Sequence, residues 1–172
     1  EGVPLYTGAF DFKPPGLYAT YALWIWLFGY SASGIHIGLL LTSLGSMVLI
    51  YFLAREMINS MAGAVAATVF GILSAGMTVT GFAAHATQFL VFWLLASYLL
   101  FRLALSTGRR TMFFFSGAAA VMAVLMKQPA ILFLLFFIVQ IFRGNRISPA
   151  ISRQTIARAG FFLAGVALPS ML

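Results

Sequence analysis

Six apolar runs separated by short basic loops constrain this chain more than any other feature. A helix needs about 20 apolar residues to cross the hydrocarbon core of a bilayer, with about 17–25 as the usual range. Hydrophobic residues make up 62% of the 172 residues and charged residues only 8%, which is more apolar surface than a water-soluble fold of this size can bury. The candidate membrane helices are Ile35 to Ala54, Ala62 to Phe82, Gln88 to Leu103, Met112 to Met126, Ala130 to Phe142 and the run from Ile156. The sequence therefore predicts an all-α, polytopic transmembrane helix bundle with about five or six membrane helices.

The distribution of basic residues predicts an orientation in the membrane. Lys and Arg number ten against three Asp and Glu, but they lie in short loops between apolar runs, which is typical of membrane topology and not of a nucleic-acid-binding protein. Because excess Lys and Arg mark the cytoplasmic side, we expect cytoplasmic arginine loops in an integral membrane protein, for instance of the bacterial inner membrane. Arg55 and Glu56 are interpreted as a solvated pair within one such loop. The arginines in question are Arg55, Arg102, Arg109, Arg110, Arg143, Arg146, Arg153 and Arg158.

The segment 16–31 is short for a crossing and unusually aromatic. Tyr and Trp favour the membrane interface, so we expect an interfacial or re-entrant helix here, after an extracytoplasmic loop over residues 1–15 and before the transmembrane bundle over residues 32–172. The alternative is that the segment crosses the membrane, which would place Lys13 on the cytoplasmic side. With an interfacial helix, most polar residues outside the arginine loops gather on the extracytoplasmic face. They are Asp11, Lys13, His85, Gln88 and Lys127.

Each of the two lysines on this face is followed within two residues by a proline. Pro14 and Pro15 fix the backbone after Lys13 and keep Lys13 itself out of the helical region, while Pro129 favours a helix start just after Lys127. A lysine held at the interface can bind a phosphate as a point charge. The alternative is that both side chains extend to the headgroup region and bind nothing in particular.

The remaining polar residues allow several roles. His85 and Gln88 are three apart and share a helix face if a helix begins there; His85 is a candidate acid or base, or a histidine wetted by the interface. Asp11 is a candidate base or the ion-pair partner of Lys13. There is no cysteine, and one histidine does not form a zinc site, which needs three or four ligands, so no metal site is predicted from the residues.

Four stretches together resemble a known family. They are 4-PLYTGAFDFKPPGLY-18, 27-LFGYSASGIHIGLL-40, 51-YFLAREM-57 and 122-MAVLMKQPAILFLL-135. Their order and spacing resemble the GT-C superfamily of integral membrane glycosyltransferases, in particular the dolichyl-phosphate-mannose protein mannosyltransferase-like and ArnT-like family. The resemblance covers nearly the whole chain and corresponds to the N-terminal portion of the family fold.

The resemblance implies an activity and a donor. Such enzymes transfer a sugar from a polyprenyl-phosphate carrier to a protein, lipid or glycan acceptor on the extracytoplasmic face. Lys13 and Lys127 match family lysines at the lipid phosphate, and Asp11 stands beside that phosphate site. The lipid-linked sugar is then the donor substrate, membrane lipid and a larger membrane complex are expected partners, and a divalent metal ion is left open as a cofactor.

The departures from the family pattern support a competing function. The family's principal catalytic carboxylate is expected upstream of Glu1, and Gln88 stands where many members have an acid, although an amide cannot serve as a general base. The alternative is therefore a non-catalytic transmembrane subunit derived from a glycosyltransferase scaffold. A transporter is disfavoured because the helix interiors are nearly free of charge.

Overall fold

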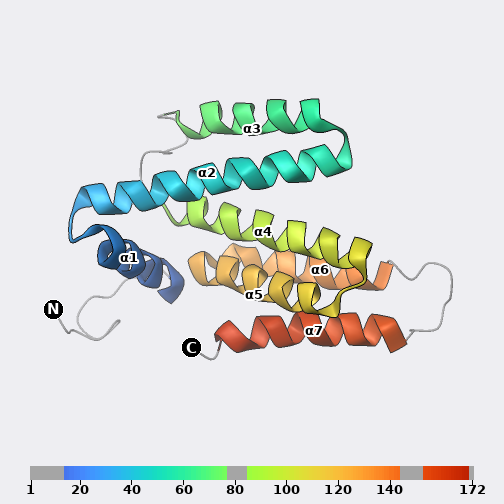
Figure 1. Cartoon of the computed structure of the whole chain (residues 1–172). Helices are drawn as coiled ribbons and strands as arrows, with labels where there is room; N and C mark the ends of the chain where they lie inside the picture. Colours follow the sequence, from blue (N-terminus) through green and yellow to red (C-terminus); the bar gives the residue numbers. More distant parts are fainter. Residues whose placement is uncertain (1–13, 77–84, 144–152, 171–172) are drawn as a thin grey trace.

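The described part of the chain is a bundle of α-helices (Figure 1). The computed structural model describes residues 14–76, 85–143 and 153–170, and every regular element within these ranges is helical. The prediction of an all-α bundle is confirmed. The helices are α1 (Pro15–Phe28), α2 (Ala32–Met57), α3 (Ser60–Ser74), α4 (Ala86–Thr107), α5 (Arg110–Met126), the short 3₁₀ helix η2 (Gln128–Ala130), α6 (Ile131–Arg143) and α7 (Arg153–Ser170).

The predicted membrane helices correspond to α2 through α7. Two of them, α2 and α4, are long and apolar enough to cross a membrane, and α3, α5 and the segment Gln128–Arg143 are shorter apolar helices. The main difference from the prediction is that α3 ends at Ser74 and does not continue to Phe82. The N–H groups of Ala75 and Gly76 turn back onto the carbonyls of Gly71 and Leu73, which closes the last turn of α3.

Local capping explains where several helices start. The side chains of Ser31 and Asn59 accept hydrogen bonds from backbone N–H groups in the first turns of α2 and α3, which satisfies donors that have no partner within the helix. At the end of α4, Gly108 adopts the left-handed conformation with φ of 68°, a common way to stop a helix. The next helix, α5, then runs back along α4 (Figure 1).

Small residues bring α4, α5 and α7 into close contact. Gly117 of α5 lies against the carbonyl oxygen of Phe162 in α7, and Gly165 of α7 lies against the carbonyl oxygen of Phe114 in α5, so a Cβ at either glycine would overlap backbone atoms. Between α4 and α5, Ser97 donates to the carbonyl of Ser116 at 2.8 Å and Ser116 donates to the carbonyl of Ser97 at 2.9 Å. Close backbone approach and interhelical hydrogen bonds both hold helices together within a membrane.

Two hydrophobic clusters lie toward opposite ends of the bundle. The first, which we call the phenylalanine cluster, joins α4, α5, α6 and α7 and consists of Phe101, Ala104, Phe113, Ala120, Phe137, Ile141 and Phe162. The second, the α1 cluster, joins α1, α2, α4 and α5 and consists of Leu17, Leu39, Ala86, Phe89 and Met126.

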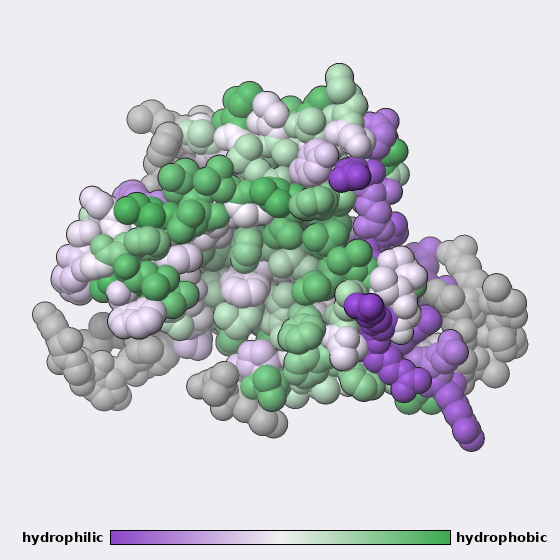
Figure 2. Space-filling view, viewed as in Figure 1, coloured by the Kyte–Doolittle hydropathy of each residue, from purple (hydrophilic) through white to green (hydrophobic). Residues whose placement is uncertain are grey.

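The arginine-bearing helix termini gather at one end, which we call the arginine end. Figure 2 shows the most hydrophilic residues at the right of the view, where α2 and α4 end, beside a largely hydrophobic middle. The interpretation of Arg55 and Glu56 as a loop pair is wrong, because both residues belong to α2 and Glu56 pairs with Arg102 of α4 at 3.0 Å. α2 and α4 run in the same direction (Figure 1), so their last turns lie side by side and bring these two side chains together.

Candidate functional site

At the opposite end, the start of α1 meets the end of α5. The backbone of Gly16 lies so close to Leu125 that a Cβ would come within 2.6 Å of its carbonyl oxygen. One turn further along α1, the Thr20 hydroxyl donates to the carbonyl of Gly16 at 2.9 Å, and its oxygen lies 3.7 Å from the sulfur of Met126. Because Lys127 follows Met126 directly, α1 packs beside the turn that carries Lys127.

Three polar side chains form a connected group at this end, which we call the lysine cluster: His85, Thr87 and Lys127. Lys127 Nζ lies 3.4 Å from Thr87 Oγ1, and Thr87 Oγ1 lies 2.9 Å from His85 Nδ1. The backbone N–H of Thr87 also donates to His85 Nδ1 at 3.3 Å, so His85 caps the start of α4. The α1 cluster lies directly beneath, through Ala86 of α4 and Met126 of α5.

The structure brings together two of the residues singled out from the sequence. His85 and Lys127 are linked through Thr87, whereas Gln88 is half-buried in the first turn of α4, where its backbone N–H donates to the carbonyl of His85 at 3.0 Å. Asp11 and Lys13 lie outside the described residues. The bridging residue Thr87 was missed from the sequence, although its position two residues after a histidine at a helix start was visible.

The ammonium group of Lys127 has a neutral hydrogen-bond partner. Lys127 is exposed, and its partner among the described residues is a hydroxyl and not a carboxylate. Glu56, the one acidic residue within the described ranges, forms an ion pair with Arg102. At 1.5 Å per residue, Arg102 lies roughly 22 Å from Thr87 along α4. Within those ranges no group of three or more His, Asp or Glu residues is placed to hold a metal ion.

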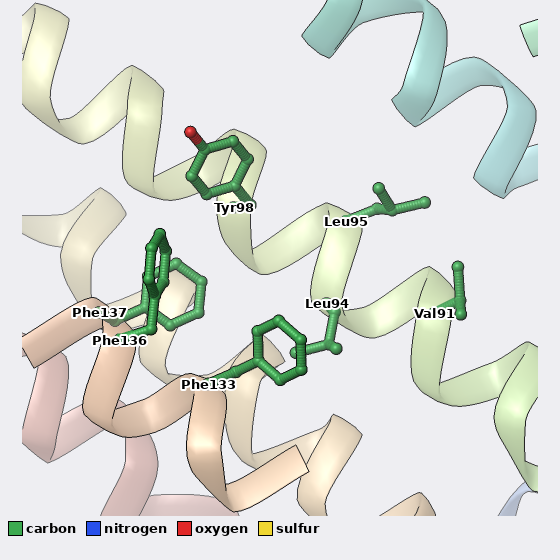
Figure 3. Close-up of a pocket in the computed structure, with 7 residues that line it drawn as sticks. All are labelled: Val91, Leu94, Leu95, Tyr98, Phe133, Phe136 and Phe137. Carbon is green, nitrogen blue, oxygen red and sulfur yellow. The ribbon is translucent and has the colours of Figure 1, made fainter. Parts of the chain in front are cut away.

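An apolar groove runs along the side of the bundle between α4 and α6. Figure 3 shows Leu94 and Tyr98 of α4 facing the phenylalanines of α6. The groove has a volume of about 380 Å³. Its floor includes the rings of Tyr98 and Phe137, whose centroids are 6.4 Å apart. The lining residues are Val91, Leu94, Leu95, Tyr98, Phe133, Phe136 and Phe137.

The groove lies further along α4 than the lysine cluster. On α4, Val91 lies roughly 9 Å beyond His85, and on the other wall Phe133 follows Lys127 after η2 and the first residues of α6. The end of the bundle thus carries a basic group and its side carries an apolar groove, an arrangement that suits a ligand with an anionic head and a hydrocarbon tail.

A comparison with known protein families shows which family the chain belongs to. Residues 12–170 match the family described as dolichyl-phosphate-mannose-protein mannosyltransferase. The chain belongs to this family. Searches of curated proteins and of solved structures found no match to this chain.

Family membership confirms the resemblance to GT-C membrane glycosyltransferases. The match covers α1 through α7 and agrees with two helices that are long and apolar enough to cross a membrane. The chain is therefore an integral membrane protein of the glycosyltransferase type.

Proposed function

We propose that the chain is part of an enzyme that transfers a sugar from a polyprenyl-phosphate carrier to a protein, lipid or glycan acceptor, and that the lysine cluster binds the carrier phosphate. The observation that carries the proposal is the exposed Lys127, whose partner is a hydroxyl. Because no carboxylate of the described residues pairs with Lys127, its ammonium group is open to an anionic ligand.

Lys13 is proposed as a second contact to the same phosphate. Its neighbour in the chain, Pro14, leads into α1, and Gly16 packs against Leu125 at the base of the Lys127 turn. Asp11, close to Lys13 in the sequence, is proposed as a polar residue of the same site.

The α4–α6 groove is proposed to hold the first isoprene units of the carrier. Its aliphatic and aromatic walls suit hydrocarbon, and its α4 wall belongs to the helix that carries Thr87. A carrier bound in this way has its phosphate at the end of the bundle and its tail along the side that faces lipid, as Phe133 with 47% exposure indicates.

The orientation follows from the charge asymmetry. Excess Lys and Arg mark the cytoplasmic side of a membrane protein, so the arginine end is assigned to the cytoplasm and the lysine cluster to the extracytoplasmic face. Transfer then takes place on that face, with α1 at the interface and the helices from residue 32 onward forming the transmembrane bundle.

The proposed reaction is an inverting displacement. An acceptor oxygen attacks the anomeric carbon, the bond from that carbon to the phosphate oxygen breaks, and the phosphate leaves with the electron pair while a carboxylate takes the acceptor proton. The Gln88 amide cannot accept that proton, so the carboxylate is a residue other than the one at position 88. Lys127 stabilises the charge that develops on the leaving phosphate.

The test is transfer by the full-length protein with a polyprenyl-phosphate sugar as donor. Because a hydrogen bond to a charged group is worth about 1.5–3 kcal/mol, we expect Lys127→Gln to lower kcat/KM about 100-fold. Arg110→Gln, which removes a charge at the arginine end, is the control and should leave transfer unchanged. Equal activity of the two variants would overturn the phosphate role.

The competing function, a non-catalytic membrane subunit, is favoured by Gln88 at the position where many family members have an acid. It predicts no turnover in the unmodified full-length protein with any polyprenyl-phosphate sugar, together with co-purification in a stable membrane complex. Measurable turnover that Lys127→Gln removes decides against it.

A further inference from the structure

We propose that Thr87 is a positioning residue of this site: it holds Lys127 in place and fixes His85 as the tautomer that carries its proton on Nε2. The inference rests on the proposed function in so far as the ligand of Lys127 is the carrier phosphate. It concerns a residue that neither the sequence patterns nor the family match assigns to the site.

The tautomer of His85 follows from the backbone. The N–H of Thr87 can only donate, and it points to His85 Nδ1 at 3.3 Å. Nδ1 must therefore be the unprotonated, accepting nitrogen of a neutral ring, which leaves the proton on Nε2. His85 is exposed, so this second nitrogen presents an N–H donor at the surface of the lysine cluster.

The direction of the remaining hydrogen bonds then follows. Because Nδ1 accepts, the Thr87 hydroxyl donates to it across the 2.9 Å contact and shares its single lone pair with the longer backbone contact at 3.3 Å. The hydroxyl oxygen keeps its lone pairs for Lys127 Nζ at 3.4 Å, and the ammonium group can only donate. Lys127, Thr87 and His85 thus form one directed chain, with Thr87 as the only link between the other two in the described contacts.

This chain explains what the hydroxyl contributes. Lysine has a long, flexible side chain, and a neutral acceptor beside its ammonium group restricts it without neutralising its charge. A carboxylate at position 87 would restrict Lys127 equally well but would compete with the phosphate. The Thr87 hydroxyl therefore holds Lys127 Nζ beside the start of α4 and leaves its charge open to an anionic group.

The first experiment measures the tautomer directly. In full-length protein with ¹⁵N-labelled histidine, reconstituted in nanodiscs, the His85 signals are assigned by their loss in His85→Gln. At a pH where the ring is neutral, we expect the ¹⁵N shift of an unprotonated Nδ1 and a protonated Nε2. A protonated Nδ1 would overturn the assignment, whatever the function of the protein.

The second experiment tests positioning through binding of undecaprenyl phosphate to the same nanodiscs. Thr87→Val keeps the shape of the side chain but removes the hydroxyl, and we expect the Kd to rise about tenfold, which corresponds to one net hydrogen bond. Thr87→Ser restores the hydroxyl and should bind within about twofold of the unmodified protein. The control is Thr107→Val at the other end of α4, where the hydroxyl donates to the carbonyl of Leu103 at 2.6 Å.

A double-mutant cycle separates positioning from an independent contact. If Thr87 acts through Lys127, Thr87→Val adds nothing once Lys127→Gln is present. Additive effects, or unchanged binding in Thr87→Val alone, would overturn the inference while leaving the phosphate role of Lys127 intact. Unchanged binding in Lys127→Gln alone would instead count against the proposed function.

Discussion

The two ends of the bundle carry positive charge in different ways. At the arginine end, guanidinium groups are spread over the termini of α2, α4, α5, α6 and α7, and Arg102 is paired with Glu56. At the other end, Lys127 has a threonine hydroxyl as its partner. The arginine end therefore has more positive charges, whereas the charge of Lys127 at the other end has no carboxylate partner among the described residues.

The packing beneath the two ends differs as well. The phenylalanine cluster near the arginine end joins four helices through edge-on and tilted rings, such as Phe101 and Phe137 at 5.2 Å. The α1 cluster beneath Lys127 is smaller and includes Leu17 of α1. The comparison leads us to expect that substitutions near the arginine end act on stability, whereas those in the lysine cluster act on the proposed binding of the carrier.

The largest effect on stability is expected at the phenylalanine cluster. Phe137 is 1% exposed and its ring contacts Phe101 and Phe162, so Phe137→Ala should lower the free energy of unfolding in detergent by about 3 kcal/mol. The control is Phe115→Ala, a substitution on α5 where the side chain is 57% exposed. The folded fraction of Phe137→Ala should still bind the carrier. A loss of binding by folded protein would contradict the view that the phenylalanine cluster affects stability and not binding.

A smaller effect is expected at the contact between α5 and α7. Leucine at Gly117 would collide with the carbonyl of Phe162, so Gly117→Leu should cost about 2 kcal/mol of unfolding free energy as overpacking. On α7 itself, Gly160 has open space around it, and Gly160→Leu should leave the thermal midpoint unchanged. Similar midpoints for both variants would contradict the close approach of the two helices.

The smallest effect is expected at the ion pair of the arginine end. The side chains of Glu56 and Arg102 are 34% and 38% exposed. Exposed ion pairs contribute little to stability because water screens them. Glu56→Gln should change the unfolding free energy by about 0.5 kcal/mol or less and leave carrier binding unaltered. A change above this range, measured by chemical unfolding, would assign the pair a larger structural role than its exposure indicates.

The helix bundle could be predicted because apolar runs of this length have few alternatives. The runs from Ile35, Gln88 and Met112 each became a helix within a few residues of the expected bounds. The turn at 127-KQP-129 was also expected, since proline favours a helix start. The α3 end at Ser74 was not, because the hydropathy continues past the point where hydrogen bonds close the helix.

The lysine cluster could be predicted only in part. Membrane topology placed His85 and Lys127 on the same face, but topology acts on whole loops and does not specify which side chains touch. Thr87 was missed because a threonine near a helix start is ordinary in a sequence, and its role depends on α5 delivering Lys127 to within 3.4 Å. The ion pair of Glu56 was misassigned for the same reason, since its partner lies on another helix.

The most direct test of the account is the affinity of undecaprenyl phosphate for the full-length protein in nanodiscs, measured without turnover for the unmodified protein, Lys127→Gln and Arg110→Gln. The account predicts that Lys127→Gln raises the Kd about 100-fold, as expected for a lost charge-assisted contact, and that Arg110→Gln leaves it unchanged. Equal losses in both variants would indicate general charge attraction, and an unchanged Kd in Lys127→Gln would contradict the assignment of the lysine cluster as the phosphate site.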